Sequence, residues 1–357
     1  MADHEREYDP VTSRRGYFWV GIELATVPYG TVPRGQMYVE WEAPVDGGRP
    51  YPVVLIHGGG GQGLDYLGTP DGRPGWATQL VQEGYTVYVV DRPGHGRSPL
   101  HPDALGSMGP MLPLEAAQGL FASPKEGEGS HPLARLQTQW PGTGGRDDPA
   151  LLQQAASSGP MMADFARAHA FEQRAGAELL DRIGPAIVVT SSAGGPTGWL
   201  MADARPEQVK ALVALETIGP PFADLPLLGV SLVWGLTAAP ITYDPPAADP
   251  SELQLVERPS PVPGGPPLML QAEPARRLPN LSRIPIAYVS AEASLFRSFD
   301  AHTVEFLRQA GCDAELVRLE DHGVRGNGHG MMVERNNREV LGVVLDWLER
   351  RVPAAGA

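Results

Sequence analysis

The sequence is nearly free of cysteine: Cys312 is the single one in 357 residues. No disulfide can therefore form within the chain, which is compatible with a reducing compartment. The first residues have neither the basic region nor the apolar core of a secretory signal peptide. Both observations favour a cytoplasmic location.

Positive charge is scarce as well. The chain has 28 Lys and Arg against 42 Asp and Glu, a net charge of −14. Nucleic-acid binding needs clustered cations that displace counterions, so a nucleic-acid partner is not expected. The sequence also lacks the run of about 18 apolar residues that a membrane span requires. Hydrophobic residues still make up 42% of the chain, which is enough for a sizeable core.

Apolar, β-branched runs alternate with helical patterns along the chain. This alternation predicts an α/β protein with a mostly parallel central sheet and helices on both faces. Strands are expected at 16–24, 36–42, 52–57, 85–91, 187–190, 209–216, 284–290 and 314–319, and helices at 75–83, 161–182, 301–310 and 336–350.

Two segments interrupt the alternation. Residues 99–160 lose all periodicity, and residues 219–279 contain too many prolines for a regular helix-and-strand segment. We expect two cap insertions over one core formed by 1–98, 161–218 and 280–357. Both follow the carboxyl ends of strands, where open α/β sheets bind ligands. The apolar stretch 221–236 could cover a cleft or form a homodimer contact.

The stretch Thr190-Ser191-Ser192-Ala193-Gly194 follows a buried strand and precedes a helical pattern. It approximates Gly-x-Ser-x-Gly, the nucleophile elbow, in which a sharp turn exposes a serine. Small neighbours are needed because the turn is strained and the helix packs closely on the strand. Thr190 replaces the first glycine of the pattern. A serine-rich loop without chemistry is the alternative.

A serine nucleophile needs a base, and three histidines follow Ser192: His302, His322 and His329. His302 lies at the start of a predicted helix and is expected to be a cap or a surface residue. His322 and His329 share a glycine-rich loop after the last strand. We favour His329 because its small neighbours let the ring reach the serine, and we expect His322 to bond its own turn. No third ligand accompanies this pair, so we expect neither a metal nor a cofactor.

Two glutamates could orient the histidine. Glu216 ends the strand after the elbow helix, and Glu292 follows the next strand. An acid after either strand can reach the histidine, and the residues themselves leave the choice open.

Acyl transfer also needs donors for the developing oxyanion. The run His57-Gly58-Gly59-Gly60 fits an oxyanion loop that offers a backbone N–H of Gly59 or Gly60, and Ala193 would supply the second. A phosphate loop is the alternative, but the Gly-Lys-Ser/Thr ending is missing. His95, in the turn after the next strand, could border the pocket.

With these motifs in place, the sequence resembles a group of bacterial and fungal esterases of the α/β-hydrolase superfamily. The resemblance implies ester hydrolysis and makes Glu216 the acid. Relatives commonly have His-Ser-Gln-Gly where this chain has Ser191-Ser192-Ala193-Gly194, and some carry adjacent cysteines at Gly59-Gly60. The matching stretches are 69–76, 87–91, 96–98, 181–186, 194–196, 202–206, 213–216 and 321–329.

The prediction is therefore a serine hydrolase that cleaves carboxylic esters through an acyl-enzyme, with a small-molecule ester as its partner. Lactone, amide or carbamate cleavage by the same triad, or a catalytically silent ligand-binding homologue, are the alternatives. The predicted catalytic residues are Ser192, Glu216 and His329. Candidate pocket walls, each of which could instead be ordinary core, are Ser191, Trp140, Trp199, Phe222 and Trp234.

Overall fold

The computed structural model describes residues 10–46, 48–122, 124, 130–225 and 229–352. One eight-stranded sheet crosses the molecule, in the order β1-β4-β6-β5-β7-β8-β13-β14. All neighbours from β6 to β14 are parallel, whereas β1 and β4 join the edge antiparallel, so the predicted mostly parallel sheet is confirmed. The strands are β1 Ser13–Val20, β4 Met37–Pro44, β5 Val53–Ile56, β6 Val87–Asp91, β7 Ala186–Ser191, β8 Val209–Leu215, β13 Ile286–Ser290 and β14 Ala314–Arg318.

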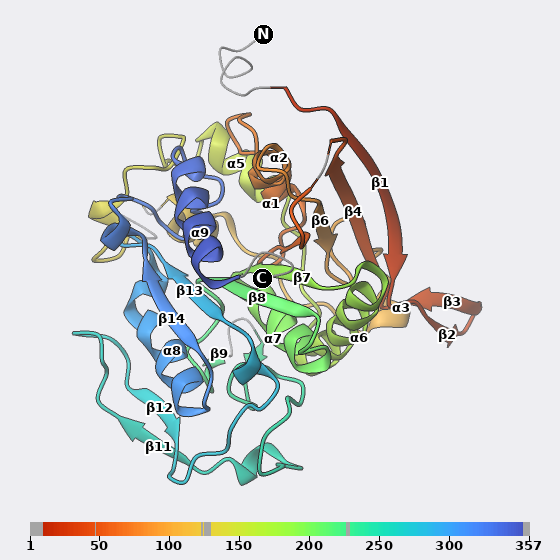
Figure 1. Ribbon diagram of the computed structural model, residues 1–357, viewed down its shortest axis with the longest axis vertical. Helices are drawn as coiled ribbons and strands as arrows, with labels where there is room; N and C mark the ends of the chain where they lie inside the picture. Colours follow the sequence, from red (N-terminus) through yellow and green to blue (C-terminus); the bar gives the residue numbers. More distant parts are fainter. Residues whose placement is uncertain (1–9, 47, 123, 125–129, 226–228, 353–357) are drawn as a thin grey trace.

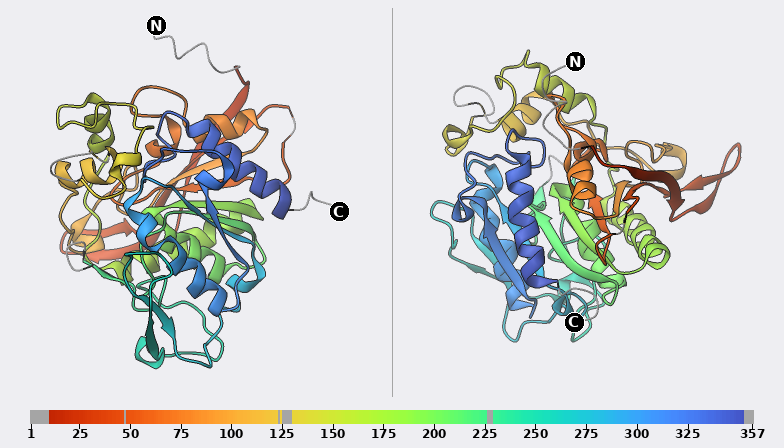
Figure 2. Two further views of the ribbon diagram at one scale, coloured as in Figure 1. Left: turned by 90° about the vertical axis from the view of Figure 1, so that its left-hand side faces the viewer. Right: turned by 45° about the horizontal axis from the view of Figure 1, so that its top comes forward.

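Both faces of the sheet are covered because successive side chains of a strand point to opposite sides. In β5, Val54 and Ile56 pack into the cluster that includes α6, α7 and α8, whereas Val53 and Leu55 pack against α2 and α9. The left view of Figure 2 shows the dark-blue α9 on one side of the sheet and the green and light-blue helices on the other. The helices are α2 Trp76–Gln82, α6 Phe165–Ile183, α7 Gly195–Ala204, α8 Asp300–Gln309 and α9 Asn337–Arg351.

Helix α6 begins later than its sequence pattern indicates. Asp164 caps it, since its carboxylate accepts a hydrogen bond from the backbone N–H of Arg167. Gly184 ends it with a φ of 81°, a left-handed value that favours glycine. Residues 161–163 therefore precede the helix, although they were expected to be part of it.

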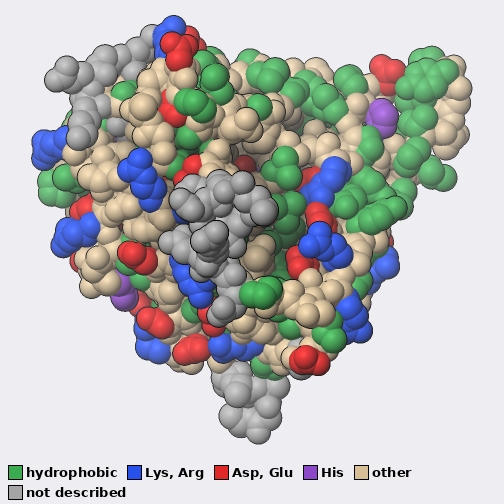
Figure 3. Space-filling view, turned by 90° about the horizontal axis from the view of Figure 1, so that it is seen from above, with side chains coloured by type: hydrophobic (Ala, Val, Ile, Leu, Met, Phe, Trp, Pro, Cys, Tyr) green, Lys and Arg blue, Asp and Glu red, His purple; other side chains and the backbone are tan. Residues whose placement is uncertain are grey.

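The amino-terminal region contains one hairpin more than predicted. Strands β1 and β4 do pair, but Gly21 turns the chain at a φ of 70° and ends the first strand early. The residues between them form the hairpin of β2 (Glu23–Val27) and β3 (Gly30–Arg34), which projects on the right in Figure 1. Figure 3 shows hydrophobic side chains gathered at this projection. Exposed apolar residues of this region are Tyr17, Ile22, Leu24 and Tyr29.

The segments expected to be caps lie between β6 and α6 and between β8 and β13. Among its described residues, the first contains three short α-helices, α3 Pro102–Leu105, α4 Leu114–Ala117 and α5 Pro149–Ala156. In the second, regular strands are confined to two small sheets among the described residues: β9 Asp224–Leu225 with β10 Val230–Ser231, and β11 Leu255–Arg258 with β12 Leu268–Gln271.

Residues 226–228 of the apolar stretch 221–236 lie outside the described residues. Around them Ala223, Val230 and Leu232 are buried together. Its function as a lid or a dimer contact stays a prediction. No helix of the described residues combines the length and the apolarity needed to cross a membrane.

Candidate active site

The strand β7 ends in a sharp turn at Ser192. This serine has a φ of 49°, a left-handed value that is uncommon for any residue with a side chain. A short turn over Ser192–Gly194 then leads into α7. A side chain at Gly194 would collide with the carbonyl oxygen of His57, so the close approach of the neighbouring loop requires glycine there. The strand–turn–helix layout expected from the sequence is present.

His329 and Glu216 form a hydrogen-bonded pair. Glu216 follows β8, His329 lies in the loop after β14, and 2.8 Å separates His329 Nδ1 from Glu216 Oε2. Both side chains are buried. Glu216 also accepts from the N–H of Ala291 at 2.9 Å and from the hydroxyl of Ser294 at 2.6 Å. An ionised carboxylate only accepts, so Nδ1 carries the proton and the lone pair of neutral His329 lies on Nε2.

The loop that carries His329 is held from two sides. The Phe296 ring stacks on the imidazole, with ring centroids 4.1 Å apart and planes 14° apart. Behind the loop, buried Glu334 accepts from Gln137 Nε2 at 2.8 Å, Asn327 Nδ2 at 2.7 Å and the Gly328 N–H at 2.9 Å. Burial raises the pKa of Glu334 to about 7, and these hydrogen bonds counteract the rise. The ring is therefore fixed by both stacking and a polar network.

The other candidates for base and acid lie elsewhere. Glu292 accepts from Arg325 at 3.1 Å and from the Gly326 N–H at 2.7 Å. His322 is exposed and ends a short helical turn. The expectation that His302 is a cap or a surface residue is wrong: it is fully buried, and its Nε2 lies 2.7 Å from the Pro266 carbonyl. Pro266 belongs to the second insertion, and a contact with so distant a segment could not be recognised from the helical pattern of 301–310.

Ser192 and His329 line one small cavity of about 60 Å³. No hydrogen bond joins Ser192 to His329 in the described part of the chain; such bonds are often long until a substrate binds. The cavity is lined by Gly58, Gly59, Gly60, Gly61, Asp65, Leu112, Leu120, Phe121, Gln154, Ser158, Ser191, Ser192, His329, Met332 and Val333.

Backbone N–H groups are oriented at this cavity by what their peptide partners bind. Because a trans peptide points its C=O and N–H in opposite directions, a fixed carbonyl also fixes the next N–H. Ser192 O accepts from the N–H of Ile218 at 2.9 Å, which directs the Ala193 N–H the other way. Gly59 O accepts from the Arg92 guanidinium, which does the same for the Gly60 N–H. Within the described residues neither N–H donates to another protein group.

Arg92 connects the glycine loop that contains Gly59 to the turn that contains Ala193. Its guanidinium donates to the carbonyls of Gly59 and Ala193 and to Glu172 Oε1, the last at 2.9 Å. Both members of the Arg92–Glu172 pair are buried. The backbone N–H of Arg92 donates to His57 Nε2 at 3.0 Å, so His57 donates through Nδ1 to Gly58 O. Burial lowers the pKa of His57 well below its usual value, which keeps this ring neutral.

Replacing Arg92 by methionine should lower the free energy of unfolding by about 3–5 kcal/mol, because Glu172 would be left as an unpaired buried charge. The Gly60 N–H should also lose its fixed direction, since the carbonyl of Gly59 loses its anchor. Denaturant unfolding of Arg92→Met, Glu172→Met and the double variant measures the coupling. The double variant should be more stable than either single one; simple additivity would show that the pair does not act as a unit.

The four large aromatic residues expected as pocket walls are not among the described residues that line this cavity. Trp199 and Trp234 belong to the main core, and Phe222 packs on Phe306 with ring centroids 5.3 Å apart. Trp140 donates to Asp148 Oδ2 at 2.8 Å. The apolar walls come instead from other residues of the first insertion and from the segment after His329. The irregular sequence of 99–160 gave no periodicity by which to identify them.

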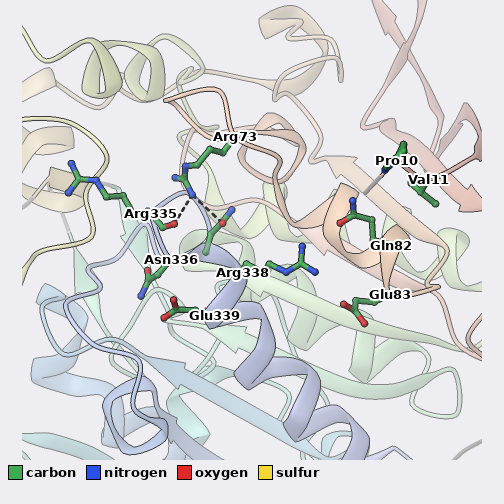
Figure 4. A pocket seen from close by; sticks show the side chains of 10 residues that line it. Pro10, Val11, Arg73, Gln82, Glu83, Arg335, Asn336, Arg338 and Glu339 are labelled. Carbon is green, nitrogen blue, oxygen red and sulfur yellow. Dashed lines mark hydrogen bonds between the residues drawn. The ribbon is translucent and has the colours of Figure 1, made fainter. Parts of the chain in front are cut away.

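A larger hollow of about 750 Å³ lies at the start of α9. As far as the chain is described, its lining contains no serine, cysteine or histidine. Figure 4 shows Arg73 directed at the backbone of this region, where it donates to Arg335 O at 2.8 Å. Its side chain therefore braces the loop before α9. Among the described residues, no group of three His, Cys, Asp or Glu side chains is arranged to hold a metal ion.

Comparison with known proteins shows the family of the chain and supports its fold. The family model described as alpha/beta hydrolase fold matches residues 51–236. A protein of Fungal sp. (strain ATCC 74256) named "Probable secreted lipase phiG" is 40% identical over 342 residues, covering 94% of this chain and 89% of that protein. The solved structure of a novel bacterial esterase superposes with a TM-score of 0.67 at 23% identity, covering 97% of this chain and 98% of its own, and supports the fold alone.

The same comparison corrects the expected location. The fungal relative is named as secreted, which contradicts the cytoplasmic location predicted from the first residues and the single cysteine. A chain without disulfides is chemically compatible with either side of a membrane, so the cysteine count could not discriminate between them.

Proposed function

The chain belongs to the α/β-hydrolase fold family, and we propose that within it the protein is a serine hydrolase that cleaves carboxylic esters through an acyl-enzyme. The observation that carries this proposal is the buried His329–Glu216 pair beside Ser192, which has a φ of 49° at the end of β7. The fungal relative, named as a probable secreted lipase, is in keeping with it.

Each residue has a definite role in the proposed reaction. Ser192 Oγ attacks the ester carbonyl from a nucleophile elbow while Nε2 of His329 takes its proton and returns it to the leaving alcohol. Glu216 holds the Nδ1 proton and stabilises the imidazolium that forms. The N–H groups of Ala193 and of Gly59 or Gly60 form the oxyanion hole, each donor contributing about 3–4 kcal/mol. Water, activated by the same histidine, then releases the acid.

The first insertion is proposed to act as a cap that shapes the pocket. Of the residues that line the cavity, Leu112, Leu120, Phe121, Gln154 and Ser158 come from 99–160. The second insertion contributes no described residue to this lining, and we propose it as a separate cap over 219–279. The secreted relative also leads us to propose an extracellular location.

A fluorophosphonate probe followed by peptide mass spectrometry tests the proposal. The probe reacts with an activated serine whatever the natural substrate, so the label is expected on Ser192 of the wild-type chain. In the His329→Ala variant labelling should fall sharply, because nothing then removes the hydroxyl proton. The His322→Ala variant is the matched control and should label like the wild type. A folded wild-type protein that takes no label would argue for a ligand-binding homologue.

A further inference from the structure

The walls of the active-site cavity differ in chemistry. One part is apolar and consists of Leu112, Leu120, Phe121, Met332 and Val333. The same cavity is also lined by four residues with polar side chains, Asp65, Gln154, Ser158 and Ser191. The proposed triad and oxyanion hole use none of these four polar side chains, and a carboxylate is the costliest of them to place in a small cavity. Asp65 therefore needs a separate explanation.

Asp65 lies in α1 (Leu64–Leu67), directly after the glycine loop that is proposed to bind the oxyanion. Its Oδ1 accepts from Gln154 Nε2 at 3.0 Å. Its Oδ2 is directed at the loop, since a Cβ built on Gly61 would lie 2.5 Å from it. Within the described ranges no donor is hydrogen-bonded to Oδ2. The carboxylate thus has one protein partner and keeps acceptor capacity beside the cavity.

The surroundings of Asp65 are unfavourable for its charge. Burial raises the pKa of its carboxyl to about 7; the hydrogen bond from Gln154 counteracts the rise, and the negative charge of Asp91 adds to it. No arginine pairs with Asp65 among the described residues, whereas Asp91 is paired with Arg97 at 2.7 Å. Asp65 is still partly exposed through the cavity, so a bound molecule can reach it. Among the described residues no protein group donates a hydrogen bond to Asp65 Oδ2, and a bound ligand could supply that donor.

Gln154 supports a ligand-binding role for Asp65. Its side chain is 7% exposed and lines the cavity, and its amide N–H is used on Asp65, which turns the amide oxygen to the other side. That oxygen and Asp65 Oδ2 are both acceptors. Asp65 Oδ2 is thus an acceptor without a protein donor among the described residues, with polar Gln154 as its neighbour in the cavity lining. A hydroxyl group, which donates one hydrogen bond and can accept another, matches this arrangement.

We infer that Asp65 and Gln154 form a subsite that binds a hydroxyl group of the substrate, so that the substrate class is a hydroxylated ester with a short apolar part. This inference rests on the proposed ester hydrolysis. The apolar wall takes the hydrocarbon, and the spare acceptor of Asp65 selects the hydroxylated molecule. An ester without the hydroxyl would cover Asp65 Oδ2 without giving it a donor, which is the basis of discrimination in sites built for a hydroxyl.

Matched ester pairs test the inference: propyl butyrate against glyceryl monobutyrate for the alcohol side, and ethyl butyrate against ethyl β-hydroxybutyrate for the acyl side. The wild type should hydrolyse the hydroxylated member of one pair with a kcat/KM about tenfold higher or more. In Asp65→Leu that ratio should fall to about one, and in Asp65→Asn, which keeps one acceptor, it should be intermediate. The exposed Asp224→Asn variant is the control and should keep the wild-type ratio.

Stability supplies a second measurement. Removing a buried carboxyl with an elevated pKa should leave the Tm of Asp65→Leu equal to or above that of the wild type, since folding no longer pays for its burial. A lower Tm with equal losses on both esters of a pair would mean a structural role and overturn the inference. An unchanged preference in Asp65→Leu would overturn it as well.

Binding separates this inference from the proposed function. Calorimetry with the Ser192→Ala protein compares the Kd of both members of each pair without turnover. Tighter binding of the hydroxylated member, lost when Asp65→Leu is added, supports the subsite even if no ester is hydrolysed. Turnover of plain esters by the wild type with no hydroxyl preference in binding would retain the proposed hydrolase and reject the subsite.

Discussion

Ser192→Ala is expected to lower kcat/KM for a simple ester by about 10⁴-fold or more, because it removes the hydroxyl that is proposed to form the acyl-enzyme. The change removes one oxygen and keeps the backbone at its φ of 49°. We therefore expect the Tm to stay within a few degrees of the wild-type value. Initial rates on a chromogenic ester and a thermal melt of the same preparation measure both quantities.

Ser290→Ala is the matched control for that experiment. Ser290 also ends a parallel strand of the sheet, is fully buried, and its hydroxyl has no hydrogen-bond partner in the described residues. Its removal should leave the rate near that of the wild type. A Ser192→Ala protein that keeps wild-type activity would exclude the proposed nucleophile, and equal losses in both variants would point to a defect of folding.

Glu216→Gln should lower kcat by about 10³–10⁴-fold with little change in KM. The Ala291 N–H fixes one oxygen of residue 216, so the glutamine oxygen should stay there and its NH₂ should face His329 Nδ1. Nδ1 would then have to accept, which moves the ring proton to Nε2. A histidine protonated at Nε2 cannot take the proton of Ser192. Steady-state kinetics on the purified variant give kcat and KM separately.

Glu292→Gln tests the same chemistry at the competing glutamate. Glu292 bonds the exposed Arg325 and the Gly326 N–H and has no bond to His329. Losing an ion pair of this kind costs about 1 kcal/mol or less, so kcat should change by no more than about fivefold. If instead Glu292→Gln were the inactive variant and Glu216→Gln the active one, the acid would have been assigned to the wrong strand.

Much of the site could be predicted from the sequence, because the patterns that indicate its strand, turn and helix each lie within a few consecutive residues. A β-branched run followed by Ser-Ser-Ala-Gly-Gly indicates a strand, a strained turn and a helix, and β7, Ser192 and α7 follow in that order. The α/β-hydrolase resemblance was confirmed by the family match, and the mostly parallel sheet by the structure. Ser192 and His329 line one cavity because the carboxyl ends of parallel strands meet at one edge.

Other features depend on which segments pack together. From the residues themselves Glu216 and Glu292 were equivalent, because each follows a strand; the hydrogen bond between Glu216 and His329 is a property of the folded loop. The cavity walls come from an insertion whose sequence has no period, and the tryptophans expected there lie in the core or bond elsewhere. The sequence pattern places Arg92 in a turn, but its guanidinium bonds the carbonyls of Gly59 and Ala193 in two different loops.

The sequence by itself determined the order of the core strands, the mostly parallel sheet and the candidate serine and histidine, because periodicity and turn chemistry act over a few residues. Only the tertiary structure decided which glutamate faces His329 and which side chains line the cavity. It also placed Asp65 in that lining with one carboxylate oxygen bonded to Gln154 and the other able to accept. These are contacts between residues far apart in the chain, and their energies depend on burial and partners that a sequence pattern does not contain.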